Sequence, residues 1–94
     1  MLVYKALYKK MMDDLKDSDM WLGWADKLED EHPDIAEYFC ACAKERLEKD
    51  FVKTYELFEH TTEKENKIDG ECLHEMVEDH IMEWHEHLMH KLKK

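Results

Sequence analysis

The sequence predicts an all-α protein, an antiparallel up-down bundle of three helices, and three observations carry this prediction. Glycine and proline are rare, with two glycines and one proline in 94 residues, so little interrupts helix formation. Apolar residues recur at spacings of three and four, the period of an amphipathic helix. Two turn signals, at Pro33 and Gly70, divide this pattern into three parts. The length indicates one helical domain, residues 1–94.

The first predicted helix covers about residues 2–31. The polar residues 17–19 could break it and cap a second segment, but the apolar stripe keeps its phase across them, so we predict one continuous helix. Pro33 suits the first turn of the next helix, where its missing N–H costs nothing. The stripe comprises Val3, Leu7, Met11, Leu15, Trp21, Leu22, Ala25 and Leu28.

The second helix is predicted over about residues 33–64 and the third over about residues 71–92, after a turn at Asp69 and Gly70. Each carries a wide apolar face, so we expect a homodimer or a higher oligomer to complete the core. In the second helix the apolar residues are Ile35, Phe39, Cys42, Ala43, Leu47, Phe51, Tyr55 and Phe58. In the third helix they are Leu73, Val77, Ile81, Trp84, Leu88 and Leu92.

Composition excludes several classes of function. The chain has 24 acidic and 14 basic residues and a net charge of −10, which argues against binding nucleic acid or anionic membranes. No apolar run approaches the roughly 20 residues of a membrane span. Three cysteines without the spacing of a disulfide scaffold, Cys40, Cys42 and Cys72, are typical of a reducing compartment, so we expect a cytoplasmic protein.

Charged residues interrupt the apolar stripes of the first two helices. Asp14 and Ser18 fall on the buried face of the first, and Arg46 continues the stripe of the second. A charge inside a bundle must be paired or hydrated. Antiparallel helices with a rise of about 1.5 Å per residue bring Asp14 and Arg46 to similar heights, which predicts a structural ion pair. Alternatively, the second helix turns its buried face towards Leu47 and Phe51 and leaves Arg46 at the rim.

Part of the second helix follows a family pattern, in the stretch WLGWADKLEDEHPDIAEYFCACAKERLEKDF. Ile35, Ala36, Phe39 and Ala43 match the I-A-x-x-F-x-x-x-A pattern that precedes E-x-x-H in ferritin-like, rubrerythrin-type proteins. The stretch resembles the first helical hairpin of that family, over about residues 11–58. The resemblance implies a ferritin-like hairpin, here followed by one more helix.

The resemblance also implies where metal ligands would lie. In this register the family's E-x-x-H positions fall at Arg46 and Lys49, and its first carboxylate falls at Asp14. A cationic Arg46 cannot ligate iron, so the resemblance implies a charge pair in place of the metal. A slip of one residue would instead place Glu45 and Glu48 there, as the ligands of an oxidase-type iron centre.

The third helix contains a second candidate metal site, in the stretch HIMEWHEHLMH at residues 80–90. With Trp84 facing the core, four residues form one stripe at successive turns: His80, Glu83, His87 and His90. Imidazole and carboxylate together suit Zn, Ni or Fe. Alternatively, these are boundary positions of an amphipathic helix and hold no cofactor. A second flank consists of His74, Glu78 and His85.

Three hypotheses of function follow. The first is a small acidic cytoplasmic protein that acts by self-association or by binding a protein partner, without catalysis. Trp24, Met82 and Met89 lie off the apolar stripes and favour such a contact surface. The second is a metal-binding protein that uses the histidine stripe or a ferritin-like centre. The third is an acidic inhibitor that mimics nucleic acid phosphate, against which the interspersed lysines argue.

Overall fold

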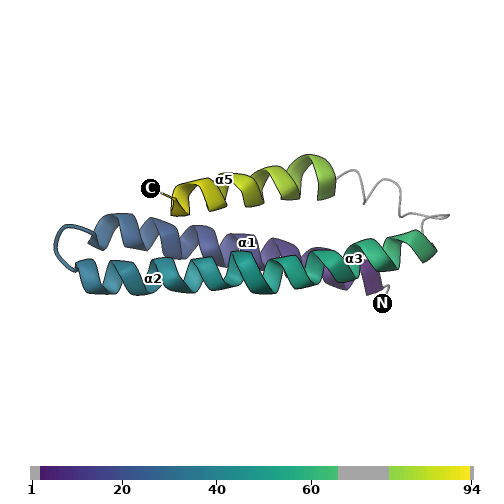
Figure 1. Ribbon diagram of the computed structural model, residues 1–94, viewed down its shortest axis with the longest axis horizontal. Coiled ribbons are helices and arrows are strands. Elements are labelled where there is room, and N and C mark those ends of the chain that lie inside the picture. The colour runs from purple at the N-terminus through teal and green to yellow at the C-terminus, as the bar shows by residue number, and fades with distance from the viewer. Residues whose placement is uncertain (1–2, 66–76, 94) are drawn as a thin grey trace.

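The computed structural model describes residues 3–65 and 77–93 (Figure 1). All regular structure in these residues is helical, which confirms the predicted all-α class. The elements are α1 (Val3–Leu28), α2 (Pro33–Glu45), η1 (Arg46–Asp50), α3 (Phe51–Glu65), η2 (Val77–Ile81) and α5 (Met82–Leu92). The predicted turn at Gly70 and the predicted start of the third helix at residue 71 lie outside the described residues.

Helix α1 is continuous across residues 17–19, as the unbroken phase of its stripe predicts. It ends at Leu28, earlier than the predicted end near residue 31. The connecting turn closes where His32 N–H donates to the Leu28 carbonyl at 2.7 Å. His32 has a non-helical backbone (φ −136°, ψ 67°), because the ring of a following proline disfavours the helical conformation. Pro33 is the first residue of α2.

The second long helix runs from Pro33 to Glu65 through α2, η1 and α3. Its middle, η1, is a π-helical segment in which the chain makes a wider turn. The N–H of Phe51 bonds to the carbonyl of Arg46, five residues back instead of four. Such a segment inserts one residue and rotates the helix face that follows it. Arg46 begins this segment, so its side chain is placed at the rotation point.

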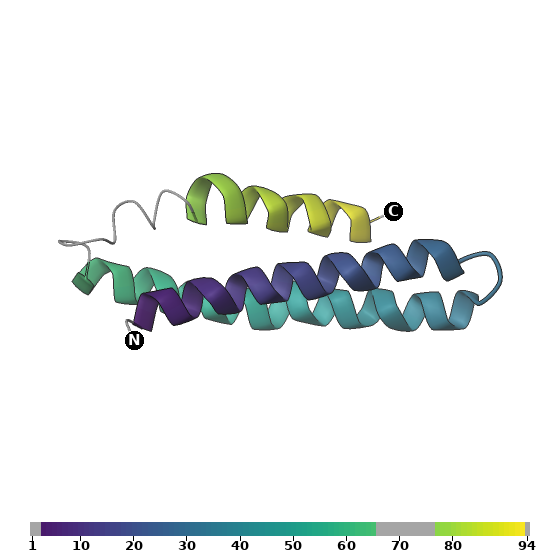
Figure 2. The same cartoon turned by 180° about the vertical axis from the view of Figure 1, so that it is seen from behind.

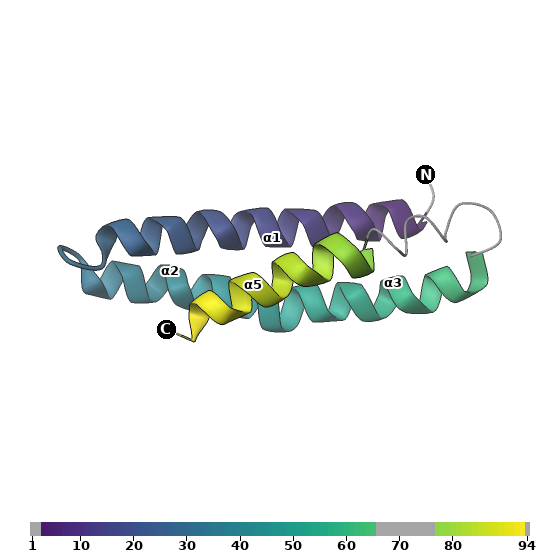
Figure 3. The same ribbon diagram turned by 90° about the horizontal axis from the view of Figure 1, so that it is seen from above.

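The two long helices are antiparallel, and α5 lies over the seam between them on one side (Figures 1 and 3). Helix α5 runs in the direction of α1 and ends short of the turn that joins α1 to α2 (Figure 2). No described helix covers the opposite side of the hairpin. The molecule is elongated, measuring 52 × 20 × 17 Å.

The core occupies the seam that α5 covers. It is built from residues of all three helical segments: Met11, Leu15, Leu22, Ala43, Leu47, Phe51, Phe58, Ile81 and Leu88. Three expectations about helix faces are wrong. Val3, placed on the apolar stripe of the first helix, is 56% exposed. The buried face of α2 contains Ala36 and Ala43, whereas Ile35, predicted to be buried, is 46% exposed. Met82 and Met89, predicted to face outward, are half-buried and pack against the core, because α5 is turned to bring its histidine-rich flank outward.

Candidate functional site

A buried carboxylate joins α1 to the second long helix. Asp14 has no exposed surface. Lys10, one turn earlier on α1, donates from Nζ to both of its carboxylate oxygens at 2.7 Å. Arg46 donates from Nε to Asp14 Oδ1 at 2.7 Å. The structure therefore brings together Asp14 and Arg46, as predicted from the charges on the apolar stripes. Lys10 is a second cation at Asp14, which was not predicted.

Arg46 is fixed from several directions. Its Nη2 donates to Asp17 Oδ2 at 3.0 Å, its Nε lies 3.6 Å from Asp50 Oδ2, and its guanidinium lies 5.6 Å from the centre of the Trp21 ring. The hydrogen bond to Asp14 is the main cause that raises the pKa of Arg46, while partial burial acts in the opposite direction. The side chain remains 27% exposed, so Arg46 both pairs with Asp14 and occupies the rim.

The alternative iron ligands lie elsewhere. Glu45 and Glu48 are exposed on the second long helix, and Lys49, the other position in the family register, is exposed beside them. Neither glutamate faces the buried Asp14 carboxylate, whose oxygens are held by Lys10 and Arg46. The geometry of the Asp14, Lys10 and Arg46 cluster indicates a structural role, which is to fix α1 and the second long helix in register.

Ser18 lies one turn after Asp14 and is also fully buried. Its Oγ has no hydrogen-bond partner within the described structure. Thr54, a buried hydroxyl on α3, differs because it donates to the Asp50 carbonyl at 2.9 Å. Ser18 is therefore a buried polar position on the interior face of α1.

His85 attaches α5 to the π-helical segment, a role that the sequence pattern did not predict. Its Nε2 lies 2.9 Å from the Leu47 carbonyl oxygen, and because a carbonyl only accepts, Nε2 carries the hydrogen. In a regular α-helix Leu47 would accept from Phe51 N–H, which here bonds to Arg46. The imidazole thus donates to the Leu47 carbonyl, whose usual helical donor, the N–H of Phe51, is bonded to Arg46 in the π-turn. The ring also stacks on Phe51, with centroids 4.2 Å apart.

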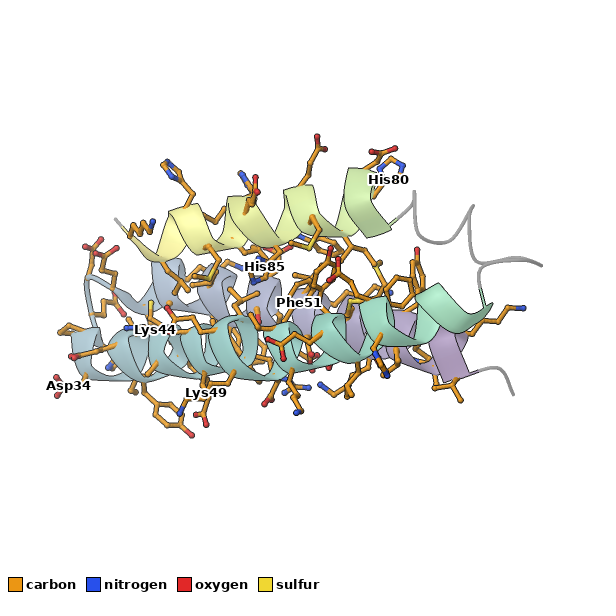
Figure 4. All side chains as sticks on the ribbon, turned by 45° about the vertical axis from the view of Figure 1, so that its right-hand side comes forward. Asp34, Lys44, Lys49, Phe51, His80 and His85 are labelled. Atoms are coloured by element: carbon orange, nitrogen blue, oxygen red, sulfur yellow. The ribbon has the colours of Figure 1, made fainter. Side chains whose placement is uncertain are left out.

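The predicted histidine stripe lies on the outer surface. His80, Glu83, His87 and His90 are all exposed, and Figure 4 shows His80 pointing away from the hairpin while His85 points towards it. Within residues 3–65 and 77–93, no three His, Cys, Asp or Glu side chains are grouped as a metal-ion site. His74 lies outside the described residues, so the flank that includes it stays a prediction.

Apolar side chains gather on the outer flank of the hairpin near its turn. Trp24 is 44% exposed and Tyr38 is 65% exposed. Both contact Phe39, with ring centroids 5.5 Å and 5.8 Å apart. Helix α5 ends on the opposite flank, next to the α1 residue Leu22. We call the outer surface the aromatic face, and it consists of Trp24, Ile35, Tyr38 and Phe39.

Comparison with protein-family models, with curated proteins and with solved structures gave no significant match. The resemblance to ferritin-like hairpins therefore stays a prediction from the sequence pattern. Among the described residues, no helix combines the length and the apolar character needed to cross a lipid bilayer.

Proposed function

We propose that this protein acts by association, and that the aromatic face binds the same face of a second copy. The observation that carries the proposal is the exposure of Trp24, Ile35 and Tyr38 on adjoining helices. Clustered apolar side chains on a surface are typical of contact sites, and aromatic residues are enriched in the centres of protein interfaces.

A second copy fits this face for a geometric reason. Helix α5 covers one side of the hairpin, and no described helix covers the other (Figure 1). Two hairpins related by a two-fold axis would apply the same apolar patch to itself, which is how an isologous contact achieves complementarity. The four long helices would then enclose a shared core, as in a four-helix bundle. A short chain gains more from such burial than a long one.

The proposal includes no catalysis. The buried carboxylate of Asp14 is compensated by Lys10 and Arg46, which supports a structural role in holding α1 to the second long helix. The exposed histidines of α5 lie on a different surface from the aromatic face, so the proposed association does not use them.

A matched pair of substitutions tests the proposal. Ile35→Glu places a charge in the aromatic face, whereas Val52→Glu places one at another exposed β-branched position of the second long helix. We expect sedimentation velocity to show a concentration-dependent dimer for the wild type and Val52→Glu, and a monomer for Ile35→Glu. Circular dichroism should be the same for all three. A wild-type monomer at every attainable concentration, or equal dissociation of both variants, would contradict the proposal.

A further inference from the structure

Helix α5 stops short of the hairpin turn (Figures 1 and 2) and leaves a hollow of about 470 Å³ between its last turn, α1 and α2. The floor of this hollow is apolar and includes Leu22, Ala25, Ala36 and Leu92. We call it the acidic groove, because Asp26, Glu29 and Glu37 also line it.

None of these three carboxylates takes part in an ion pair within the described part of the chain. Lys91, which also lines the acidic groove, is directed to Asp19 on α1, with Nζ 3.8 Å from Oδ1. The carboxylates are exposed. Asp26 lies on α1, Glu29 in the turn that follows it, and Glu37 on α2. Three negative charges from two helices and the turn between them therefore surround an apolar floor, and none of them is paired within residues 3–65 and 77–93.

The charges of all three carboxylates act on the thiol of Cys40 and raise its pKa. Cys40 is half-buried on α2 and lines the acidic groove. Its pKa is raised, first by burial and then by the charges of Asp26, Glu29 and Glu37. All three carboxylates thus act on one point of the groove, and the negative potential there opposes any anionic occupant.

A second hollow, of about 450 Å³, extends the acidic groove along α2. It shares Glu37, Cys40 and Leu92 with the first and is lined further along by Ala41 and Met89. It is also lined by charges of both signs, Lys44, Glu48 and Lys93. The two hollows together offer a path for several consecutive side chains, with the excess of negative charge at the end near the hairpin turn.

We propose that the acidic groove binds a basic amphipathic segment of a partner protein. An apolar side chain of the segment would cover the floor, and a lysine or arginine one turn away would lie among the three carboxylates. Amphipathic segments commonly dock into apolar grooves in this way, and unlike charges at the rim give specificity and speed association. A bare metal ion suits the groove less well, because no three His, Cys, Asp or Glu side chains of the described residues are grouped closely enough to hold one.

Isothermal titration of the full chain with a designed peptide tests this inference. The probe is a synthetic amphipathic helix of leucine and lysine, and its counterpart carries glutamate in place of lysine. The groove variant is Asp26→Asn/Glu29→Gln/Glu37→Gln. The control variant, Glu45→Gln/Glu56→Gln/Glu86→Gln, removes the same number of charges from exposed positions outside the groove.

We expect the wild type and the control variant to bind the lysine peptide, and the groove variant to bind it at least about tenfold more weakly, which is about 1.4 kcal/mol. The bound peptide should also slow alkylation of Cys40, read by mass spectrometry of proteolytic fragments. No binding to the wild type, equal weakening in both variants, or equal binding of the glutamate peptide would overturn the inference. Ile35→Glu should leave peptide binding intact, which separates this test from the proposed dimer.

Discussion

Asp14 shows how one residue can determine the relation between two helices. Its carboxylate is enclosed in the core and accepts from Lys10 on its own helix and from Arg46 across the interface. Charges buried as a pair add little net stability, but each becomes costly when its partner is removed. The cluster therefore selects the register in which Asp14 and Arg46 meet over registers in which they do not.

Arg46→Met should destabilise the protein measurably. Removing one partner of a buried ion pair typically costs about 3–5 kcal/mol, and the retained Lys10 should keep the loss near the lower end of that range. The double variant Asp14→Leu/Arg46→Met replaces both charges with apolar groups and should recover most of the loss. Urea unfolding followed by circular dichroism measures both. If the double variant were as unstable as the single variant, the pairing would not be the source of the effect.

The sequence predicted the Asp14–Arg46 contact because both charges stand on apolar stripes, where a charge needs a partner. It did not predict the role of His85, although a signal exists. His85 is four residues after Ile81 and three before Leu88, which places it on the same stripe as these buried residues. The predicted stripe contained Ile81, Trp84 and Leu88, all of which pack in or against the core, but His85 was assigned to a flank of the helix.

At the scale of elements, the π-helical segment is the feature of the second long helix that helical periodicity in the sequence did not predict. Pro33 and the scarcity of glycine predicted where the second helix starts and that it is long. The buried residues Ala36, Ala43 and Leu47 lie at ordinary helical spacings of seven and four, so the exposure of Ile35 does not require the π-turn. The π-turn rotates only the helix face that follows it, and its formation depends on tertiary packing. A π-turn costs hydrogen-bond geometry and persists where contacts favour it. Here His85 supplies such a contact from another helix.

His85→Phe tests the link between α5 and the π-helical segment. Phenylalanine keeps a ring to stack on Phe51 but cannot donate to the Leu47 carbonyl, so we expect a loss of about 0.5–1.5 kcal/mol in the free energy of unfolding. His87→Phe, at an exposed position of the same helix, should change it by less than about 0.5 kcal/mol. Equal effects of the two substitutions would show that the hydrogen bond contributes nothing.

At the scale of the whole molecule, two surfaces lie on opposite flanks of the hairpin. The aromatic face is apolar and suits a second copy, whereas the acidic groove carries unpaired negative charge and suits a basic segment. The net charge of −10 opposes association of two copies, and salt screens this repulsion. The proposed dimer should therefore strengthen as salt is added, and peptide binding in the groove should weaken.

Sequence patterns predicted the helical class and the presence of an exposed apolar surface. Trp24, which lies off the apolar stripe of α1, indicated that surface most clearly and is exposed. They could not predict the acidic groove, because it depends on where α5 ends relative to the turn between α1 and α2. Asp26, Glu29 and Glu37 look like ordinary solvated carboxylates until the end of α5 is placed next to them.

The fluorescence of Trp24 tests the central claim most directly. In a Trp21→Phe/Trp84→Phe background, Trp24 is the remaining tryptophan and reports on the aromatic face. We predict that its emission shifts to shorter wavelength and that acrylamide quenches it less as protein concentration rises, and that Ile35→Glu abolishes both changes. Emission and quenching that stay constant while sedimentation shows a dimer would place the contact elsewhere and contradict the account.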